Sequence, residues 1–223
     1  MTQLTNNVRY LQIAFNYDRA TVMSILPRIP YSDRILIEAG TPYIKREGIR
    51  GIQLMRRLWK GLIVADIKVK DGANGEVDMI HQAGANAATV LGTAPTETIN
   101  LFISRCKELG ILSMMDLIGV TEPLDVLRPL RKAPDVAVIH RGRDEEGVHG
   151  KVIQYRQVSR IRSKFNSFIS VAGGVDLREA RSAIFNGANI VVANLVHPKD
   201  NWAGIQITDD VPAIAQKFLE TIS

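Results

Sequence analysis

The chain is poor in cysteine and has no long apolar run. Its 223 residues include one cysteine, Cys106, which excludes an intrachain disulfide and predicts a reducing, cytoplasmic setting. No apolar stretch approaches the ~20 residues that span a bilayer. The opening segment MTQLTNNVRYLQ lacks the basic and apolar regions of a signal peptide. We therefore predict a protein with no membrane partner, in which Cys106 is a packed helical thiol rather than a nucleophile.

Signs of nucleic-acid binding are also missing. The net charge is +5, but the basic residues are spread along the chain and the densest groups fall on predicted helices. Solvated helix faces explain them, and neither a zinc-ligand spacing nor an aromatic stacking pattern is present. A mildly basic protein would suit a phosphorylated small substrate instead.

Short apolar runs recur along the chain, with helical patterns between them. The runs are rich in Val, Ile and Leu and do not alternate with polar residues, as expected of strands buried on both faces. The predicted strands are Tyr10 to Phe15, Ile35 to Glu38, Leu62 to Asp66, Ala87 to Leu91, Ile111 to Leu117, Val136 to His140, Phe168 to Ala172 and Ile190 to Ala193. The predicted helices are Ala20 to Leu26, Ile49 to Trp59, Glu76 to Ala83, Thr96 to Leu109, Pro123 to Arg131, Val152 to Ser163, Leu177 to Asn186 and Val211 to Ile222.

Strict alternation of strand and helix predicts a parallel sheet. Eight strand–helix units in one chain indicate a single-domain α/β fold, a (β/α)₈ TIM barrel over residues 1–223. A doubly wound open sheet is the alternative, but it would usually have fewer strands and a glycine-rich first turn. The first turn here reads Asn16-Tyr17-Asp18.

Polar residues stand where the predicted strands end. In a (β/α)₈ barrel these carboxyl ends meet at one mouth, where catalysis occurs. Glu38 and Asp66 on neighbouring strands would repel one another unless a lysine or a divalent cation lies between them. In chain order the strand-end residues are Asn16, Glu38, Asp66 with Lys68, Gly92-Thr93, Asp116, His140 with Arg143, Ala172-Gly173-Gly174 and Asn194.

Each of these residues also has a purely structural interpretation. Asp71 and Asp144 could cap the helices that follow them, Glu38 could be an ordinary ion-pair partner, and a lone His140 is more often a core residue than a catalyst. These interpretations weaken because one barrel mouth must hold the whole set.

The segment SVAGGV at 170–175 raises the possibility of phosphate binding. Gly173 and Gly174 follow the seventh strand and precede a helix, so their backbone N–H groups could approach an anion. Barrels frequently bind phosphate after strands seven and eight, although a Gly-Gly pair can also simply make a turn.

Several motifs resemble one known group. ADIKVKD matches the Asp-x-Lys-x-x-Asp motif of the orotidine 5′-monophosphate decarboxylase suprafamily, and IEAGTPYIKREG at 37–48 looks like its 3-hexulose-6-phosphate synthase and 3-keto-L-gulonate-6-phosphate decarboxylase branches. AGANAATVLGTA, MMDLIGV and SVAGGV look like the synthase. The resemblance runs from about Gln12 to Asn194.

The resemblance implies a sugar phosphate substrate, Mg²⁺ or Mn²⁺ as cofactor, and an enediolate intermediate. By analogy Glu38 and Asp66 are metal ligands, Lys68 is a cation beside the developing oxyanion, and His140 carries a proton. Asp71 would reach the partner subunit's site, which implies a homodimer with shared active sites. Such charge stabilisation and proton exchange are chemically coherent.

Three departures from the family pattern stand out. Asn16 replaces the usual Asp after strand one, and Ala193-Asn194-Leu195 replaces an Ala-Gly-Gly or Ala-Gly-Arg sequence. HRGRDEEG at 140–147 places Arg143 as in the decarboxylase, whereas Asp116 and Ala172 point to the synthase.

The leading hypothesis is an aldol-type lyase or synthase that joins formaldehyde to ribulose 5-phosphate, or the reverse. In this interpretation Asn16, Asp116 and Arg143 bind the substrate, while Gly173, Gly174 and Asn194 hold its phosphate. The alternatives are a β-keto acid decarboxylase of a sugar phosphate, in which Arg143 orients a water, and a non-catalytic barrel that binds a ligand.

Overall fold

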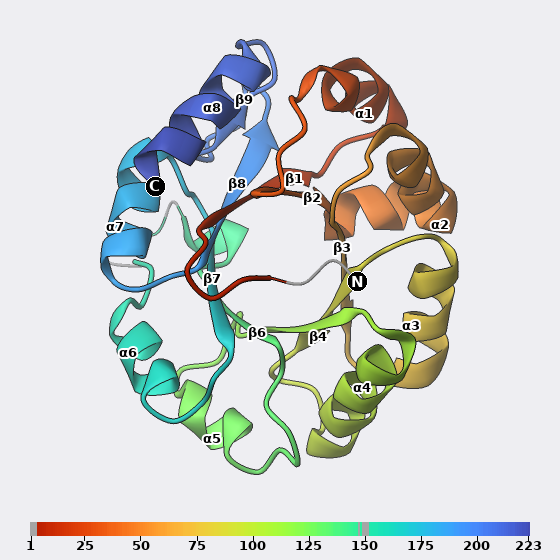
Figure 1. Ribbon diagram of the computed structural model, residues 1–223, viewed down its shortest axis with the longest axis vertical. Helices are drawn as coiled ribbons and strands as arrows, with labels where there is room; N and C mark the ends of the chain where they lie inside the picture. The colour runs from red at the N-terminus through yellow and green to blue at the C-terminus, as the bar shows by residue number, and fades with distance from the viewer. Residues whose placement is uncertain (1–3, 147, 149–151) are drawn as a thin grey trace.

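Eight parallel strands close into a barrel inside a ring of helices (Figure 1). The computed structural model describes residues 4–146, 148 and 152–223, so the first three residues of the predicted domain and Gly147 of the HRGRDEEG segment lie outside the described part. Closure is shown by β1, which pairs with both β2 and β8, and it confirms the predicted (β/α)₈ barrel. The barrel strands are β1 (Tyr10–Phe15), β2 (Ile35–Ala39), β3 (Ile63–Val69), β4 (Ala87–Leu91), β5 (Leu112–Asp116), β6 (Val136–His140), β7 (Phe168–Ala172) and β8 (Ile190–Val196).

The helices agree with the predicted order but differ at their ends. The second begins at Thr41 instead of Ile49, because Pro42 suits a first helical turn, and a positive φ of 60° at Gly48 then interrupts it. The fifth and sixth are shorter than predicted. Their bounds are α1 (Arg19–Ile25), α2 (Thr41–Leu58), α3 (Ala73–Gln82), α4 (Thr96–Leu109), α5 (Pro123–Leu127), α6 (Arg156–Arg162), α7 (Leu177–Phe185) and α8 (Val211–Thr221), with short 3₁₀ helices η1 (Leu26–Arg28) and η2 (Arg143–Glu145).

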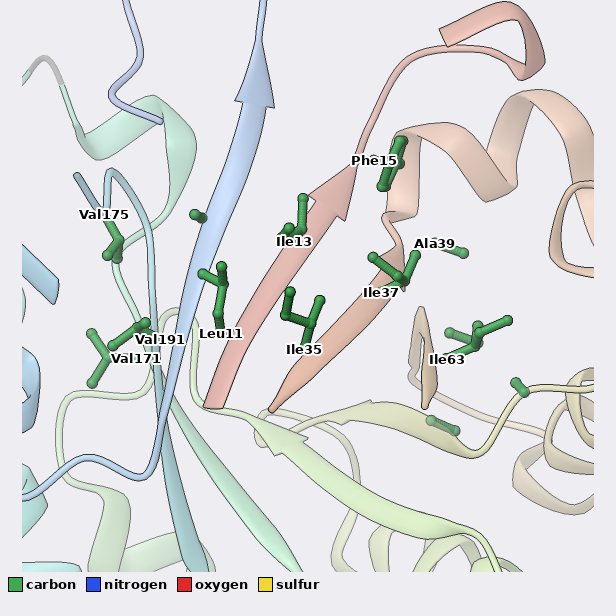
Figure 2. Close-up of a cluster of buried hydrophobic side chains, with 14 of the residues drawn as sticks. Leu11, Ile13, Phe15, Ile35, Ile37, Ala39, Ile63, Val171, Val175 and Val191 are labelled. Atoms are coloured by element: carbon green, nitrogen blue, oxygen red, sulfur yellow. The ribbon is translucent and has the colours of Figure 1, made fainter. Parts of the chain in front are cut away.

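The outward faces of the strands form the main core. Alternate residues of β1 and β2, such as Leu11, Ile13 and Ile37, point away from the barrel axis and are fully or almost fully buried (Figure 2). They pack with apolar side chains of the surrounding helices, for example Ile52 and Phe102. Each strand is therefore buried on both faces, which explains its mostly apolar sequence.

The inward faces form a second, smaller cluster. Tyr10, Leu36, Val64, Met114 and Ile190 belong to it, and Leu4 and Val8 pack against it from the segment before β1. On most strands the inward position nearest the carboxyl end is polar, for example Glu38 on β2, Asp66 on β3 and Asp116 on β5, whereas β7 ends in Ala172. An apolar floor therefore supports a polar upper layer, and that layer forms the site.

One strand lies outside the predicted set. A ninth strand, β9 (Ile205–Gln206), pairs in parallel with the end of β8.

Within the described residues, no helix combines the length and apolar character needed to cross a membrane. Cys106 is fully buried on α4, and burial raises the pKa of its thiol, as expected of a packed side chain.

Candidate active site

A cavity of about 270 Å³ opens at the carboxyl ends of the barrel strands. It brings together most of the predicted site residues although they come from seven different strand–loop units. Of the predicted set, those lining it are Asn16, Glu38, Asp66, Lys68, Asp116, His140, Arg143, Gly173 and Asn194. Gly174 and Asp71 are not among its lining residues.

Lys68 lies between two carboxylates. Its Nζ is 3.2 Å from Asp66 Oδ1 and forms an ion pair with Asp116 Oδ2. Burial alone would lower the pKa of Lys68, but the attraction of Asp66 and Asp116 outweighs it and raises the pKa above its ordinary value. The ammonium is therefore a fixed cation in the cavity.

Asp116 connects Lys68 to His140. The side chain of Asp116 is 2% exposed, and both of its oxygens lie 3.0 Å from His140 Nδ1. Burial would raise the pKa of Asp116, yet His140 and Lys68 hold it well below its usual range. Burial would lower the pKa of His140, yet Asp116 raises it. This contact occupies Nδ1 and leaves Nε2 as the ring nitrogen for proton exchange.

Glu38 is buried beside Asp66 and accepts a hydrogen bond of 2.5 Å from Gln12 Nε2. Burial, followed by repulsion from Asp66, raises the pKa of Glu38 from an ordinary 4.5 to about 7. A divalent cation would relieve both effects. Within the described residues, no group of three or more His, Cys, Asp or Glu side chains could hold a metal. The two carboxylates of Glu38 and Asp66 nevertheless suit Mg²⁺, because this ion is commonly bound by one or two carboxylates and keeps waters or substrate oxygens as its other ligands.

Two threonines hold the Asp66 carboxylate, and sequence reasoning missed both. Thr41 Oγ1 lies 2.7 Å from both the backbone oxygen and Oδ2 of Asp66, while Thr89 Oγ1 donates to Oδ1 at 2.8 Å. Thr89 is a polar residue inside the apolar run AATVL, and Gln12 stands likewise inside YLQIAF. Such isolated polar residues in buried strands were the available signal.

Asn16 and Asn194, which sequence analysis singled out as departures from the resembled pattern, meet between the neighbouring strands β1 and β8. Asn16 Nδ2 donates to Asn194 Oδ1 at 3.0 Å. Asn194 is not at the end of its strand as predicted, because β8 continues to Val196 and pairs with β9. Gly204 packs so tightly on this strand that a Cβ there would overlap the backbone oxygen of Asn194.

The glycine pair after β7 has a positive φ at both residues, 98° at Gly173 and 64° at Gly174. A Cβ on Gly173 would overlap Arg141 O, and Arg141 Nη2 donates to Gly173 O at 3.1 Å. A Cβ on Gly174 would overlap Arg141 Nη2 and would lie 2.7 Å from Glu146 Oε2. A guanidinium and a carboxylate of the protein thus both lie against the turn proposed for phosphate.

The segment after β8 contacts two residues that line the cavity, Arg143 and Glu146. The guanidinium of Arg143 lies 4.2 Å from the ring centroid of Trp202, and Ala203 N donates to Glu146 Oε2 at 3.4 Å. Tyr17 donates to Asp200, and burial and that contact raise the pKa of Tyr17 to about 12. The contact with Trp202 therefore holds Arg143 at the edge of the cavity. Trp202 was not among the residues predicted from the sequence.

Asp71 lies apart from this cluster. It is exposed, and its Oδ1 accepts a hydrogen bond of 2.8 Å from Gly72 N, immediately before α3. The residue that caps α3 is Gly72 rather than Asp71. The contacts within this one chain give Asp71 no part in the cavity.

The fold and the composition of the mouth define a class of barrel with a partly buried lysine held between strand-end carboxylates. The chain belongs to the orotidine 5′-phosphate decarboxylase / HUMPS family, whose model matches residues 9–194.

Curated relatives carry a more specific name. The chain is 35% identical over 215 residues to the bifunctional enzyme Fae/Hps of Methanothrix thermoacetophila, covering 96% of this chain and 52% of the relative. It is 36% identical over 216 residues to the bifunctional enzyme Fae/Hps of Methanosarcina acetivorans, covering 96% and 53%. The chain thus spans about half the length of the curated relatives it matches.

Two solved structures have the same fold as this chain. The 3-hexulose-6-phosphate synthase of Salmonella typhimurium superposes with a TM-score of 0.82 at 25% identity, covering 96% of this chain and 98% of that one. The 3-keto-L-gulonate-6-phosphate decarboxylase of Vibrio cholerae superposes with a TM-score of 0.74 at 20% identity, covering 97% and 98%. The second likeness shows the fold alone.

Proposed function

We propose that this chain is a carbon–carbon lyase of the 3-hexulose-6-phosphate synthase type, joining formaldehyde to ribulose 5-phosphate or cleaving the product. The observation that carries the proposal is the contact series Asp66–Lys68–Asp116–His140 within one cavity. The names of the curated relatives and of the solved synthase support the same reaction.

The first step needs a base at C1 of ribulose 5-phosphate. His140 Nε2 takes the C1 proton, and Asp116 stabilises the imidazolium that forms. The electron pair left at C1 is delocalised into the C2 carbonyl, which gives the enediolate. C1 then attacks the carbon of formaldehyde and the C2 carbonyl re-forms. The new alkoxide takes up the proton that His140 Nε2 removed, which returns His140 to its neutral form, so atoms and charges balance.

Lys68 supplies positive charge where the enediolate oxygen becomes negative. Its ammonium is already fixed by Asp66 and Asp116, so little reorganisation is needed during the reaction. Mg²⁺ or Mn²⁺ held by Glu38 and Asp66 would polarise the C2 carbonyl as a Lewis acid. Glu38 and Asp66 fit this role because each carboxylate faces the same cavity.

The other end of the substrate is assigned to the mouth between β6, β7 and β8. Gly173, Gly174 and Asn194 would hold the phosphate, with Asn16 and Arg143 contacting the sugar. Arg143 lines the cavity, so a guanidinium is available to an anionic or hydroxylated substrate.

The test is incubation of the purified protein with ribulose 5-phosphate, formaldehyde and MgCl₂, following the loss of both reactants and the formation of hexulose phosphate. We expect equimolar consumption that EDTA suppresses and excess Mg²⁺ restores. Consumption of neither reactant would refute the proposed reaction, and indifference to EDTA would refute the Glu38–Asp66 metal site.

The position of Arg143 favours one second candidate, decarboxylation of a β-keto acid sugar phosphate. There Arg143 would orient the water that protonates the enediolate. The reactions share an intermediate, so CO₂ release from 3-keto-L-gulonate 6-phosphate distinguishes them. Binding of sugar phosphate without turnover of either substrate would instead indicate a ligand-binding barrel.

We also propose a homodimer with shared active sites. Asp71 is exposed and outside the cavity of its own chain, as a residue that serves a partner's site would be. Light scattering at micromolar concentration should give twice the mass of one chain, and a monomer that turns over substrate would refute shared sites.

A further inference from the structure

The pairing of β3 with β4 is irregular where the catalytic motif lies. Ala65 pairs with Ala88 and Val69 pairs with Val90. Residues 66–68 of β3 therefore stand opposite a single residue of β4, Thr89. Such a bulge re-aims side chains and deprives backbone groups of their regular ladder partners.

One hydroxyl group takes the place of those partners. Thr89 Oγ1 accepts a hydrogen bond of 2.9 Å from Lys68 N and donates one of 2.8 Å to Asp66 Oδ1. Thr89 is 4% exposed, so water does not compete effectively for these bonds. The donor and an acceptor position of the hydroxyl are both used, on two residues of the same motif.

Lys68 has an unusual backbone conformation at this point. Its φ is 50°, and it is the one residue other than glycine with a positive φ in the described part of the chain. That conformation is unfavourable for a residue with a side chain, because its Cβ comes too close to the following carbonyl oxygen. It places the Lys68 ammonium against Asp66 and Asp116, so the groups that hold this turn also set the position of the cation.

We propose that Thr89 is a positioning residue for the reaction. Its hydroxyl fixes the backbone turn at Lys68 and the rotation of the Asp66 carboxylate together. The inference rests on the proposed function for its kinetic consequence, whereas its structural part does not depend on which reaction occurs. A Thr89 that only fills space in the barrel would tolerate any side chain of equal volume.

The test compares Thr89→Val, which keeps the shape and removes the hydroxyl, with Thr89→Ser, which keeps the hydroxyl. Thr98→Val is the matched control, since Thr98 is a buried threonine on α4 outside the cavity lining. We expect Thr89→Val to lose about 10–100-fold in kcat, the usual effect of removing a partner that orients a ligating carboxylate, with a smaller change in KM. Thr89→Ser and Thr98→Val should stay within about threefold of wild type.

Crystal structures of the wild type and Thr89→Val give a readout independent of turnover. We expect the variant to lose the positive φ at Lys68 or to rotate the Asp66 carboxylate. Kinetics and geometry both unchanged in Thr89→Val, or Thr89→Ser as impaired as Thr89→Val, would overturn the proposal. If Thr89→Val does not fold, Thr89→Ala replaces it in both measurements. A wild-type protein inactive on every substrate refutes the proposed function, and the crystal structures then decide the role of Thr89.

Discussion

Asn16 and Asn194, 178 positions apart in the chain, are joined by a hydrogen bond of 3.0 Å from Asn16 Nδ2 to Asn194 Oδ1. Sequence analysis singled out each of them as a departure from the pattern that the chain resembles. Their contact closes the polar ring between β1 and β8 with two neutral amides. The two departures are therefore one structural feature.

This contact makes Asn16→Asp an informative variant. The new carboxylate would face the Asn194 oxygen, but the Asn194 amide can rotate and present its NH₂ group instead. We expect synthase activity equal to wild type or up to about tenfold higher, the ~1.4 kcal/mol of one hydrogen bond made in the transition state. Steady-state kcat/KM for ribulose 5-phosphate is the measurement. A tenfold loss would show that the amide pair itself is needed.

Lys68 and Asp71 can be tested together by complementation. Lys68→Ala should lower kcat by at least ~10²–10³, the cost of losing one group that stabilises the oxyanion, and Asp71→Ala should be impaired through the partner's site. Mixed dimers of the two variants contain one site with both residues intact. Activity should therefore return when the inactive proteins are refolded together.

The control for this experiment is Lys70→Ala, because Lys70 is exposed, donates a hydrogen bond to the backbone oxygen of Thr93 and lies outside the cavity lining. Its activity should match wild type. Mixed proteins that stay inactive would argue that Asp71 does not serve a second subunit, and circular dichroism checks that each variant is folded.

Glu38 should make the metal-free protein less stable at high pH. Its pKa rises from 4.5 unfolded to about 7 folded, so the folded state holds this proton more tightly. The associated stability is fully present below pH 4.5 and is lost as the pH rises through about 7. In Glu38→Gln this pH-dependent loss of unfolding free energy, on the order of 3 kcal/mol, should disappear.

The measurement is the Tm of EDTA-treated wild type and Glu38→Gln at pH 5 and pH 8. Between pH 5 and pH 8 we expect the Tm of Glu38→Gln to fall less than the Tm of wild type. The variant should also lose Mg²⁺-dependent turnover. Identical pH dependence of the two proteins would show that Glu38 ionises normally, and the argument for a cation between Glu38 and Asp66 would lose its electrostatic basis.

Glu146 should compete with phosphate for the turn at Gly173 and Gly174. Its Oε2 lies against Gly174 and accepts from Ala203 N, and burial raises the pKa of its carboxyl. In Glu146→Gln we expect inorganic phosphate to inhibit turnover at about tenfold lower concentration, because a like charge is removed. Asp144→Asn, which removes the same charge elsewhere on the cavity, is the control. Unchanged or weaker inhibition in Glu146→Gln would place the phosphate elsewhere.

Much of this protein could be predicted from local patterns. Apolar runs with helical segments between them identified the barrel, because a strand covered on both faces needs continuous apolar sequence. The residues at the strand ends could be assigned to one mouth because parallel strands in a barrel deliver their carboxyl ends to the same side. Lys68, Asp66, Asp116 and His140 followed from that rule alone.

The tertiary structure decided which of these side chains touch. Asp116 bonds both Lys68 and His140, a relationship between three strands that no spacing in the sequence encodes. The roles of Thr89, Gln12 and Glu146 were also hidden. Thr89 depends on the bulge in β3, Gln12 on the pairing of β1 with β2, and Glu146 on the loops after β7 and β8. Strand order is fixed by short-range periodicity and chain connectivity, whereas hydrogen-bond partners are fixed by register and closure, which only the assembled barrel sets.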